Sequence, residues 1–472
     1  MRLPLLIPIV VLSAAVSAQA PAPAHLRAQQ TALDRYVAAP DSAFAFRKVG
    51  LLAAEGDVEI SLLELTSQQW LDATAVDRPE WTHWLVVYRP AVVRHDVALL
   101  HVGGGSNDGR RPRRGNPALL TMAQDTGTVV AELRMVPNQP LTLLGDPERK
   151  PRKEDDLIAY TWDRYLRTAD ARWPLRLPMT KAVVRAIDAL TAWTAGPEGG
   201  GRPARRFVVS GASKRGWTAW TAAAVDSRIV AVAPLVIDVL NVEPSFVHHW
   251  RVYGFWAPAV QDYVDHDIMS WMGSREFAGL MRIEDPWFYR DRLTMPKFML
   301  NSAGDQFFLP DSSRFYFDAL HGEKHLRYVP NSDHSLEDTD AAQSLHAFYA
   351  TVVSNRARPR VTWRIDAAGA LRVTSSERAA RVRLWQATNP EARDFRLETI
   401  GRAWTAVDLP SAGPNTWIAR VAPPSSGWTA FFVELTFPSG GRHPFITTTE
   451  VRVVPDRVTY PPPQPSSPAG HR

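Results

Sequence analysis

The chain has 472 residues, of which 45% are hydrophobic and 22% charged, a composition typical of a globular protein large enough for two domains. It has no cysteine, which excludes disulfides, thiol nucleophiles and cysteine-ligated metals. The formal net charge is +5, but the basic residues are scattered. The densest run, Arg110–Arg114, favours a solvated loop over a nucleic-acid site, with a basic rim that attracts anionic substrates as the alternative.

The first 20 residues have the pattern of a secretory signal peptide. Arg2 precedes an apolar run from Leu3 to Val16, and Ala18 and Ala20 form a small-residue cleavage signal. The run is too short to span a membrane comfortably, although an uncleaved anchor is the alternative. We expect cleavage near Ala20, a secreted or periplasmic location, and no stable membrane insertion after cleavage.

Strand and helix patterns alternate through residues 21–355. After a short helix near 32–37, apolar runs predict strands at 58–65, 84–88, 97–102, 128–133, 207–209, 229–236, 297–301 and 326–329, the first of them a half-buried edge strand. Helices are predicted near 155–169 and 179–193. This alternation predicts an α/β domain with a mostly parallel sheet, helices on both faces, and functional residues at the carboxyl ends of the strands.

Residues from about 241 to 295 interrupt this alternation. The stretch has no clear strand and is rich in aromatic side chains, so we interpret it as a helical cap inserted over the mouth of an active site. We predict that Trp250, Trp256 and Trp271 include at least one substrate-binding residue that lines the pocket. The alternative is that all three pack the cap onto the sheet.

The pattern changes again near residue 356. Residues 356–456 hold about seven short strands with turn signals, which predicts a C-terminal immunoglobulin-like β-sandwich domain. The Pro- and Ser-rich residues 457–472 are predicted to form a disordered tail.

The segment RFVVSGASKRG, residues 206–216, carries the most chemical information. An apolar strand, a tight turn at Ser213 and a following helix form the pattern of the nucleophile elbow of α/β-hydrolases. The turn would expose the serine hydroxyl at the sheet edge, beside the free N–H groups of a helix N-terminus. The usual motif is G-x-S-x-G, whereas here the second glycine is displaced to Gly216.

A serine nucleophile needs a base and an orienting acid, which follow it in the order acid, then histidine, in α/β-hydrolases. Asp305 follows the predicted strand 297–301 across a small-residue turn, and His334 follows the strand that ends at 329. We therefore predict Ser213, Asp305 and His334 as a catalytic triad. Asp238 is the second candidate for the acid and Asp333 the third.

The oxyanion hole of such a site uses two backbone N–H donors. One is predicted from Lys214, directly after the nucleophile, and the other from the loop Gly103-Gly104-Gly105, which follows the strand 97–102. Basic side chains in the first turn of a helix oppose its dipole. Lys214 and Arg215 are therefore predicted to add positive charge near the oxyanion or to bind an acidic substrate group, with Arg215 named as a substrate-binding residue and solvated first-turn residues as the alternative.

Four blocks carry a family resemblance: EDDLIAYTWDRYL from residue 154, GASKRGWTAW from 211, AGDQFF from 303 and NSDHS from 331. Together they resemble the PhoPQ-activated pathogenicity-related protein family over about residues 30–455. The resemblance implies a secreted α/β-hydrolase-like protein, and some bacterial members are linked to virulence and peptide resistance. The elbow also resembles that of glucuronoyl esterases more weakly, with Ala212 in place of cysteine and Lys214 in place of arginine.

The function predicted from these features is a secreted serine hydrolase that cleaves an ester, or less favourably an amide, through an acyl-enzyme. Its substrate would be a small molecule, a sugar ester or a peptide, and no cofactor, metal or nucleic-acid partner is expected. The alternatives are a non-catalytic binding or signalling protein on a hydrolase scaffold and a carbohydrate-directed esterase or binder. The sequence leaves the oligomeric state open.

Overall fold

The computed structural model describes residues 30–464 with the exception of residue 368. The predicted signal peptide, residues 1–20, and the last eight residues of the predicted tail lie outside the described residues. Within residues 30–464, none of the described helices has the length and apolar character needed to cross a membrane.

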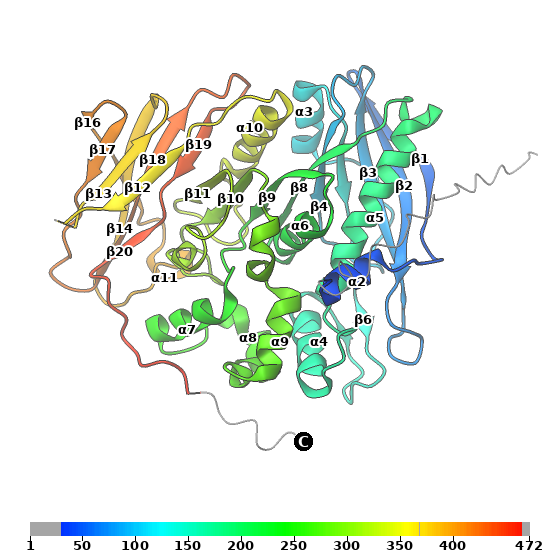
Figure 1. The fold of residues 1–472 in the computed structure, drawn as a ribbon, viewed down its shortest axis with the longest axis horizontal. Helices are drawn as coiled ribbons and strands as arrows, with labels where there is room; N and C mark the ends of the chain where they lie inside the picture. The colour runs from blue at the N-terminus through cyan, green and yellow to red at the C-terminus, as the bar shows by residue number, and fades with distance from the viewer. Residues whose placement is uncertain (1–29, 368, 465–472) are drawn as a thin grey trace, which may run out of the picture.

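One mixed sheet runs through the molecule in the order β1-β2-β3-β5-β4-β8-β9-β10-β11-β19-β18-β14-β15, and β20 pairs with β18 (Figure 1). The antiparallel end consists of β1 (Ala45–Glu55), β2 (Val58–Gln69) and β3 (Glu80–Pro90). The parallel centre consists of β5 (Val130–Leu133), β4 (Val97–Val102), β8 (Arg206–Ala212), β9 (Ile229–Leu235), β10 (Lys297–Ser302) and β11 (Lys324–Val329). The predicted α/β class with a mostly parallel centre is confirmed.

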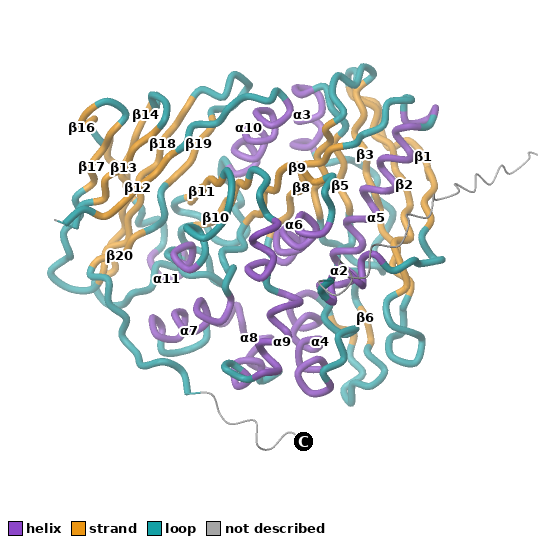
Figure 2. Tube along the Cα trace, in the orientation of Figure 1, coloured by secondary structure: helices purple, strands orange, loops and turns teal. Residues whose placement is uncertain are grey.

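Helices cover both faces of this sheet because its central strands are apolar on both sides. Along β4, Ala98 and Leu100 belong to one core, while Val97 and Leu99 belong to the other. The first core is closed by α2 (Ala32–Ala38), α4 (Glu154–Thr168), α5 (Arg176–Ala195) and α6 (Lys214–Val225). The second is closed by α3 (Pro117–Thr126) and α10 (Ala341–Val353), and Figure 2 shows the helices against the strands.

The connection between β9 and β10 is helical, as its sequence predicts. It contains α7 (Val242–Tyr253), α8 (Gln261–Asp265) and α9 (Arg275–Glu284), with short 3-10 turns at Pro258–Val260, Ile268–Trp271 and Pro286–Arg292. In Figure 1 these helices gather with α4 in the lower part of the view. Trp162 of α4 packs against Tyr263 of α8 with ring centroids 5.3 Å apart, so the connection is anchored to α4.

The C-terminal strands lie in two sheets. β12 (Val361–Ile365), β13 (Leu371–Ser375), β17 (Thr416–Ala419) and β16 (Ser411–Gly413) form a separate sheet. β14 (Arg381–Asn389), β15 (Thr405–Asp408), β18 (Trp428–Phe437), β19 (Phe445–Thr448) and β20 (Arg452–Val454) extend the central sheet, which they join where Leu326 of β11 pairs with Thr448 of β19. Leu371 and Trp417 of the separate sheet share a core with Leu384 and Val433 of the extension. The short strands are as predicted.

Shorter elements complete the fold. They are β6 (Leu141–Thr142) paired with β7 (Pro151–Arg152), the helix α11 (Leu397–Ile400), and 3-10 turns at Pro197–Gly199 and Ser312–Phe315.

Two sequence predictions are wrong. The strand 58–65 is not an edge strand, because β1 lies outside it; two register shifts and a partly exposed surface hide the alternation of β1 in the sequence. The tail is not disordered from residue 457, because the N–H groups of Thr459 and Tyr460 donate to the carbonyl of Arg251 on α7.

Candidate active site

Ser213 occupies a strained turn between β8 and α6. Its backbone angles are φ 56° and ψ −129°, a left-handed region that non-glycine residues rarely adopt. The turn is held because the Ser213 N–H donates to the carbonyl of Leu235 at 2.8 Å. An unfavourable conformation maintained at a strand-to-helix junction is the geometry of a nucleophile elbow.

The displaced glycine of the motif has a packing role in this turn. A Cβ on Gly216 would lie 2.7 Å from the carbonyl oxygen of Gly211, and a Cβ on Gly211 would lie 2.7 Å from that of Arg215. Either contact is too short for a side chain. The two glycines therefore allow α6 to start directly against β8, although their spacing departs from G-x-S-x-G.

Asp305 and His334 are joined as the sequence predicts. His334 Nδ1 lies 2.8 Å from Asp305 Oδ2, and Asp305 Oδ1 accepts the N–H of Phe307 at 2.8 Å. The backbone N–H of His334 donates to Oε1 of Gln306 at 2.9 Å. Asp305 is buried and His334 partly exposed, so the carboxylate is held by fixed donors while the ring keeps access to the surface.

The strand registers bring the three predicted residues to the same sheet edge. Ala212, directly before Ser213, pairs with Leu235, which pairs with Leu300 of β10. Ser302 at the end of β10 pairs with Val329 at the end of β11. The loops bearing Ser213, Asp305 and His334 thus leave the sheet on one side. Within the described chain, Ser213 and His334 share this edge without a hydrogen bond between them; such contacts are often long without substrate.

The two other candidate acids have different partners. Asp238 is fully buried and accepts the hydroxyls of Tyr316 at 2.5 Å and Tyr328 at 2.6 Å. Burial raises its pKa to about 7, against the lowering effect of these hydrogen bonds. Asp333 accepts the N–H and hydroxyl of Ser335. Only Asp305 meets the imidazole among the three.

The glycine loop offers two N–H donors rather than three. The Gly103 N–H already donates to the carbonyl of Leu133 at 2.7 Å, which corrects the prediction that Gly103 contributes to an oxyanion hole. Within residues 30–464, the N–H groups of Gly104, Gly105 and Lys214 have no acceptor. Gly105 has φ 138°, which favours glycine.

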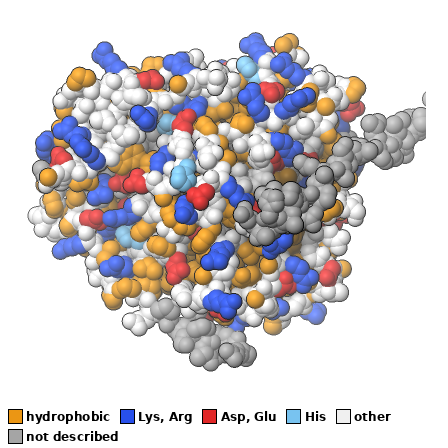
Figure 3. Space-filling view, viewed as in Figure 1, with side chains coloured by type: hydrophobic (Ala, Val, Ile, Leu, Met, Phe, Trp, Pro, Cys, Tyr) orange, Lys and Arg blue, Asp and Glu red, His pale blue; other side chains and the backbone are white. Residues whose placement is uncertain are grey.

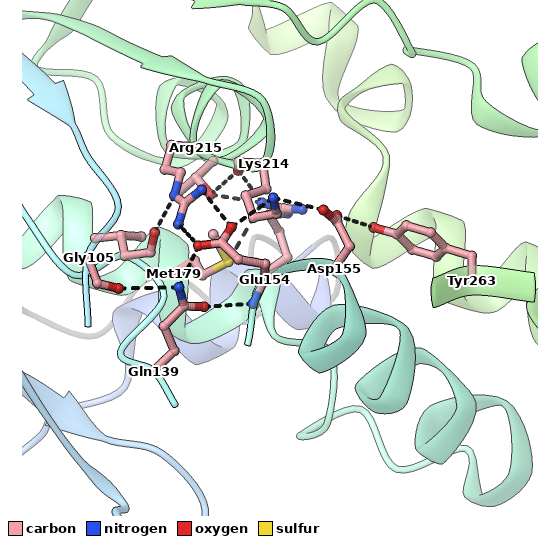
Figure 4. Close-up of polar contacts among 11 residues, drawn as sticks. Gly105, Gln139, Glu154, Asp155, Met179, Lys214, Arg215 and Tyr263 are labelled. Atoms are coloured by element: carbon pink, nitrogen blue, oxygen red, sulfur yellow. Dashed lines mark hydrogen bonds and ion pairs between the residues drawn. The ribbon is translucent and has the colours of Figure 1, made fainter. Parts of the chain in front are cut away.

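The basic pair after the serine is not free. Lys214 Nζ lies 2.9 Å from carboxylate oxygens of both Glu154 and Asp155, and Arg215 forms a two-point ion pair with Glu154 at 2.6 and 2.8 Å (Figure 4). The predicted roles, charge near the oxyanion or binding of an acidic substrate group, would require these carboxylates to release them. Although burial opposes it, the hydrogen bonds and charges of Arg215 and Lys214 lower the pKa of Glu154 to about 2.

Glu154 is the residue of this site that the sequence prediction missed. The acidic run Glu154-Asp155-Asp156 at the start of α4 was a visible signal. Cations in the first turn of a helix oppose its dipole, and the carboxylates of α4 offset this effect for Lys214 and Arg215.

The three predicted cap tryptophans differ in their surroundings. Trp256 lines a narrow cavity of about 20 Å³, together with Phe307 and Phe308. These phenylalanine rings flank the His334 ring, with centroids 4.4 and 6.0 Å from it. Trp250 packs on Trp256 with centroids 5.3 Å apart. Trp271 is 6% exposed and belongs to the first core, so of the three Trp256 is the one that lies with Phe307 and Phe308, the rings around His334.

A larger hollow of about 580 Å³ lies between α7 and α9, lined by residues that include Val247, Arg251, Met281 and Phe288. On the face shown in Figure 3, Lys and Arg side chains are interspersed with Asp and Glu.

The run Arg110–Arg114 forms part of the β4–α3 connection, and its four arginines are exposed.

Comparison with known proteins places the chain in a family. The model of the PhoPQ-activated pathogenicity-related protein family matches residues 33–396. The chain is 35% identical over 459 residues to autocrine proliferation repressor protein A of Dictyostelium discoideum, an alignment that covers 91% of this chain and 92% of that protein.

Similar solved structures include acetyl xylan esterase 1 from Thermoanaerobacterium sp. JW/SL YS485 (17% identity, TM-score 0.47) and a glucuronoyl esterase from Solibacter usitatus (13%, TM-score 0.40). Each comparison covers 68% of this chain and 91% of the other. Likeness at this level assigns neither a substrate nor a reaction. The family model and the Dictyostelium relative do establish kinship, and the chain belongs to the PhoPQ-activated pathogenicity-related protein family.

Proposed function

We propose that the protein is a serine hydrolase that cleaves an ester or amide through Ser213, His334 and Asp305. The observation that carries the proposal is the 2.8 Å contact between His334 and Asp305, on the sheet edge where Ser213 holds a strained elbow conformation. An acid-held imidazole at the same sheet edge as a serine on such a turn is the arrangement from which a hydroxyl nucleophile can be activated.

The proposed reaction has two half-steps. Ser213 Oγ attacks the substrate carbonyl carbon while its proton passes to His334 Nε2, and Asp305 stabilises the resulting imidazolium. The oxyanion accepts N–H groups of Lys214 and of Gly104 or Gly105. Collapse breaks the bond to the leaving alcohol or amine, which takes the proton from His334. Water then attacks the acyl-enzyme and gives a proton to His334. His334 passes this proton to Ser213 Oγ as the bond to the acyl group breaks, which releases the acid and free Ser213.

We favour an ester over a peptide bond as the substrate, with a small molecule or sugar ester as the first class to test. The proposal includes the β9–β10 connection as a cap over the site. This is supported by Trp256, which lines a cavity with Phe307 and Phe308, the two rings that pack against His334. It also includes an immunoglobulin-like C-terminal sandwich, supported by the two packed sheets, and export, supported by the pattern of residues 1–20.

A second candidate function is a non-catalytic signalling or binding role. The observation in its favour is the 35% identity to a relative whose name is autocrine proliferation repressor protein A. A carbohydrate-binding role, with or without catalysis, rests on the aromatic side chains of the β9–β10 connection and is tested by binding to immobilised polysaccharides.

The test is an activity screen over acyl esters, sugar esters and aminoacyl amides, with the wild type and Ser213→Ala assayed in parallel. The proposal expects hydrolysis of at least one class by the wild type and its loss in Ser213→Ala. Equal turnover by both proteins would reject Ser213 as the nucleophile. No turnover of any class would favour the signalling role.

A further inference from the structure

The strongest feature outside the proposed triad is the carboxylate of Glu154, which lies at the centre of a polar network (Figure 4). Its Oε1 meets Arg215 Nη2 at 2.6 Å and accepts Gln139 Nε2 at 2.5 Å. Its Oε2 meets Arg215 Nη1 at 2.8 Å and Lys214 Nζ at 2.9 Å. One side chain from α4 thus binds two residues of the elbow helix and one residue of the segment that follows β5.

This network reaches the glycine loop through Gln139. Gln139 Nε2 also donates to the Gly105 carbonyl at 3.2 Å, and its Oε1 accepts the backbone N–H of Glu154 at 2.8 Å. The Gln139 amide is therefore fixed from both ends by Glu154, so its contact with Gly105 has a defined direction.

Arg215 provides a second connection to the same loop. Its Nε donates to the carbonyl of Val136 at 2.6 Å, and the Val136 N–H donates to the Gly103 carbonyl. The guanidinium also lies directly against Gly104, since a Cβ there would be 2.7 Å from Arg215 Nη2. The Gly104 carbonyl accepts the Met135 N–H at 2.9 Å. The backbone of Met135 and Val136 thus holds the carbonyls of Gly103 and Gly104, and Arg215 anchors this backbone at the Val136 carbonyl.

Each planar peptide unit joins the carbonyl of one residue to the N–H of the next, so fixing the Gly103 and Gly104 carbonyls also fixes the direction of the Gly104 and Gly105 N–H groups. The N–H groups of Gly104 and Gly105, with that of Lys214, have no acceptor in the described part of the chain. Oxyanion stabilisation depends on donors that are oriented before the reaction begins. Glu154 itself has φ 52°, an unfavourable conformation for a side-chain-bearing residue.

We propose that Glu154 is a positioning residue for the oxyanion hole. Through Arg215 and Gln139 it holds the glycine loop against the elbow, so that the N–H groups of the loop and of Lys214 converge on the carbonyl oxygen of a substrate bound at Ser213. This inference rests on the proposed hydrolase function and extends it to a residue outside the triad.

The test compares Glu154→Gln with Asp156→Asn. Asp156 lies in the same first turn of α4 and loses the same charge, but its partners are Lys150, Arg152 and His266 rather than residues of the elbow. On the best ester substrate we expect Glu154→Gln to lower kcat by about 10- to 100-fold with KM little changed, less than the loss of an oxyanion donor itself. Asp156→Asn should leave both constants near wild type.

A transition-state analogue separates positioning from folding. We expect Glu154→Gln to weaken binding of a trifluoromethyl ketone by the same factor as kcat/KM falls, while binding of the product alcohol, which places no oxygen in the oxyanion hole, is unchanged. Gln139→Met, which removes the contacts with Gly105 and Glu154 without changing charge, should also lower kcat. It also serves as the second variant if Glu154→Gln does not fold.

Wild-type kcat in Glu154→Gln and Gln139→Met, or equal losses in Glu154→Gln and Asp156→Asn, would overturn the inference while leaving the hydrolase function intact. If the wild type neither turns over any substrate nor reacts with a serine-directed phosphonate, the proposed function fails and the inference fails with it.

Discussion

Asp305 and His334 lie on loops that follow neighbouring parallel strands, and their side chains meet at 2.8 Å. The two loops are tied together below this contact, because Ser302 Oγ donates to the Ser332 carbonyl at 2.8 Å and Ser332 Oγ lies 3.0 Å from Ser302 Oγ. The pair is therefore held by the sheet edge as well as by its own hydrogen bond.

The identity of the acid is testable by a matched pair of substitutions. Asp305→Asn should lower kcat by about 10⁴-fold, because an asparagine favours the wrong imidazole tautomer. Asp238→Asn should have a small effect on kcat, since Asp238 meets Tyr316 and Tyr328 rather than the imidazole. Steady-state kinetics on one ester substrate decides, and reversed effects would move the acid to Asp238.

The cap proposal predicts different outcomes for two tryptophans. Trp256→Ala should raise KM more than it lowers kcat, because Trp256 lines the cavity beside Phe307 and Phe308. Trp271→Ala should leave the kinetics unchanged and lower the free energy of unfolding by about 3–5 kcal/mol. Thermal melts run beside the kinetics distinguish the two. An unchanged KM in Trp256→Ala together with a large loss of stability would remove Trp256 from the substrate pocket.

Burial of Asp238 predicts a pH-dependent stability. Its pKa is raised from 3.8 to about 7, so the folded protein keeps a proton that the unfolded chain releases. The contribution of this bound proton to the free energy of unfolding is complete below about pH 4 and is lost as the pH rises through 7. The total change is on the order of 4 kcal/mol. The free energy of unfolding, measured with denaturant from pH 4 to 8, should fall less steeply with pH in Asp238→Asn than in the wild type.

Asp96→Asn is the control for this measurement. The hydrogen bond from Arg206 lowers the pKa of Asp96, so its titration lies below the range examined and the slope should match the wild type. An Asp238→Asn slope equal to that of the wild type would show that folding does not raise the pKa of Asp238.

The buried ion pair of Arg176 and Glu284 should be a major support of the elbow helix. Both side chains are fully buried, and Arg176 Nη1 also donates to the Lys214 carbonyl at 2.7 Å. Glu284→Ala leaves a buried unpaired charge and should cost about 3–5 kcal/mol of unfolding free energy. Asp408→Ala breaks the exposed pair with Arg381 and should leave the melting temperature unchanged. Similar melting temperatures for the two variants would contradict this.

The sequence predicts those residues of the site that can each be recognised from the single strand that precedes them. Ser213, Asp305 and His334 each come directly after an apolar run, so local pattern and the rule that functional groups lie at the carboxyl edge suffice to propose them. The parallel centre of the sheet is predictable for the same reason, since each of its strands is a short apolar run between helical segments.

Features that depend on distant segments meeting in space were not predictable in this way. Glu154 contacts Arg215, 61 residues later, and no spacing rule links the start of α4 to the elbow. The addition of β19 to β11 rests on the pairing of Leu326 with Thr448 and on hydrogen bonds of the Thr447 and Thr448 hydroxyls, about 120 residues away from β11 in the sequence. The loss of Gly103 as a donor follows from its bond to Leu133, which a glycine-rich motif does not reveal.

The most direct test of the central claim is covalent labelling by a fluorophosphonate, read by intact mass and peptide mapping. The account predicts one adduct per chain, located on Ser213, with no labelling of Ser213→Ala and strongly reduced labelling of His334→Ala, both variants remaining folded by circular dichroism. Because the two residues act as a unit, Ser213→Ala combined with His334→Ala should lose no more ester turnover than Ser213→Ala alone. Absence of labelling in the folded wild type, or an adduct on another residue that persists in Ser213→Ala, would contradict the account.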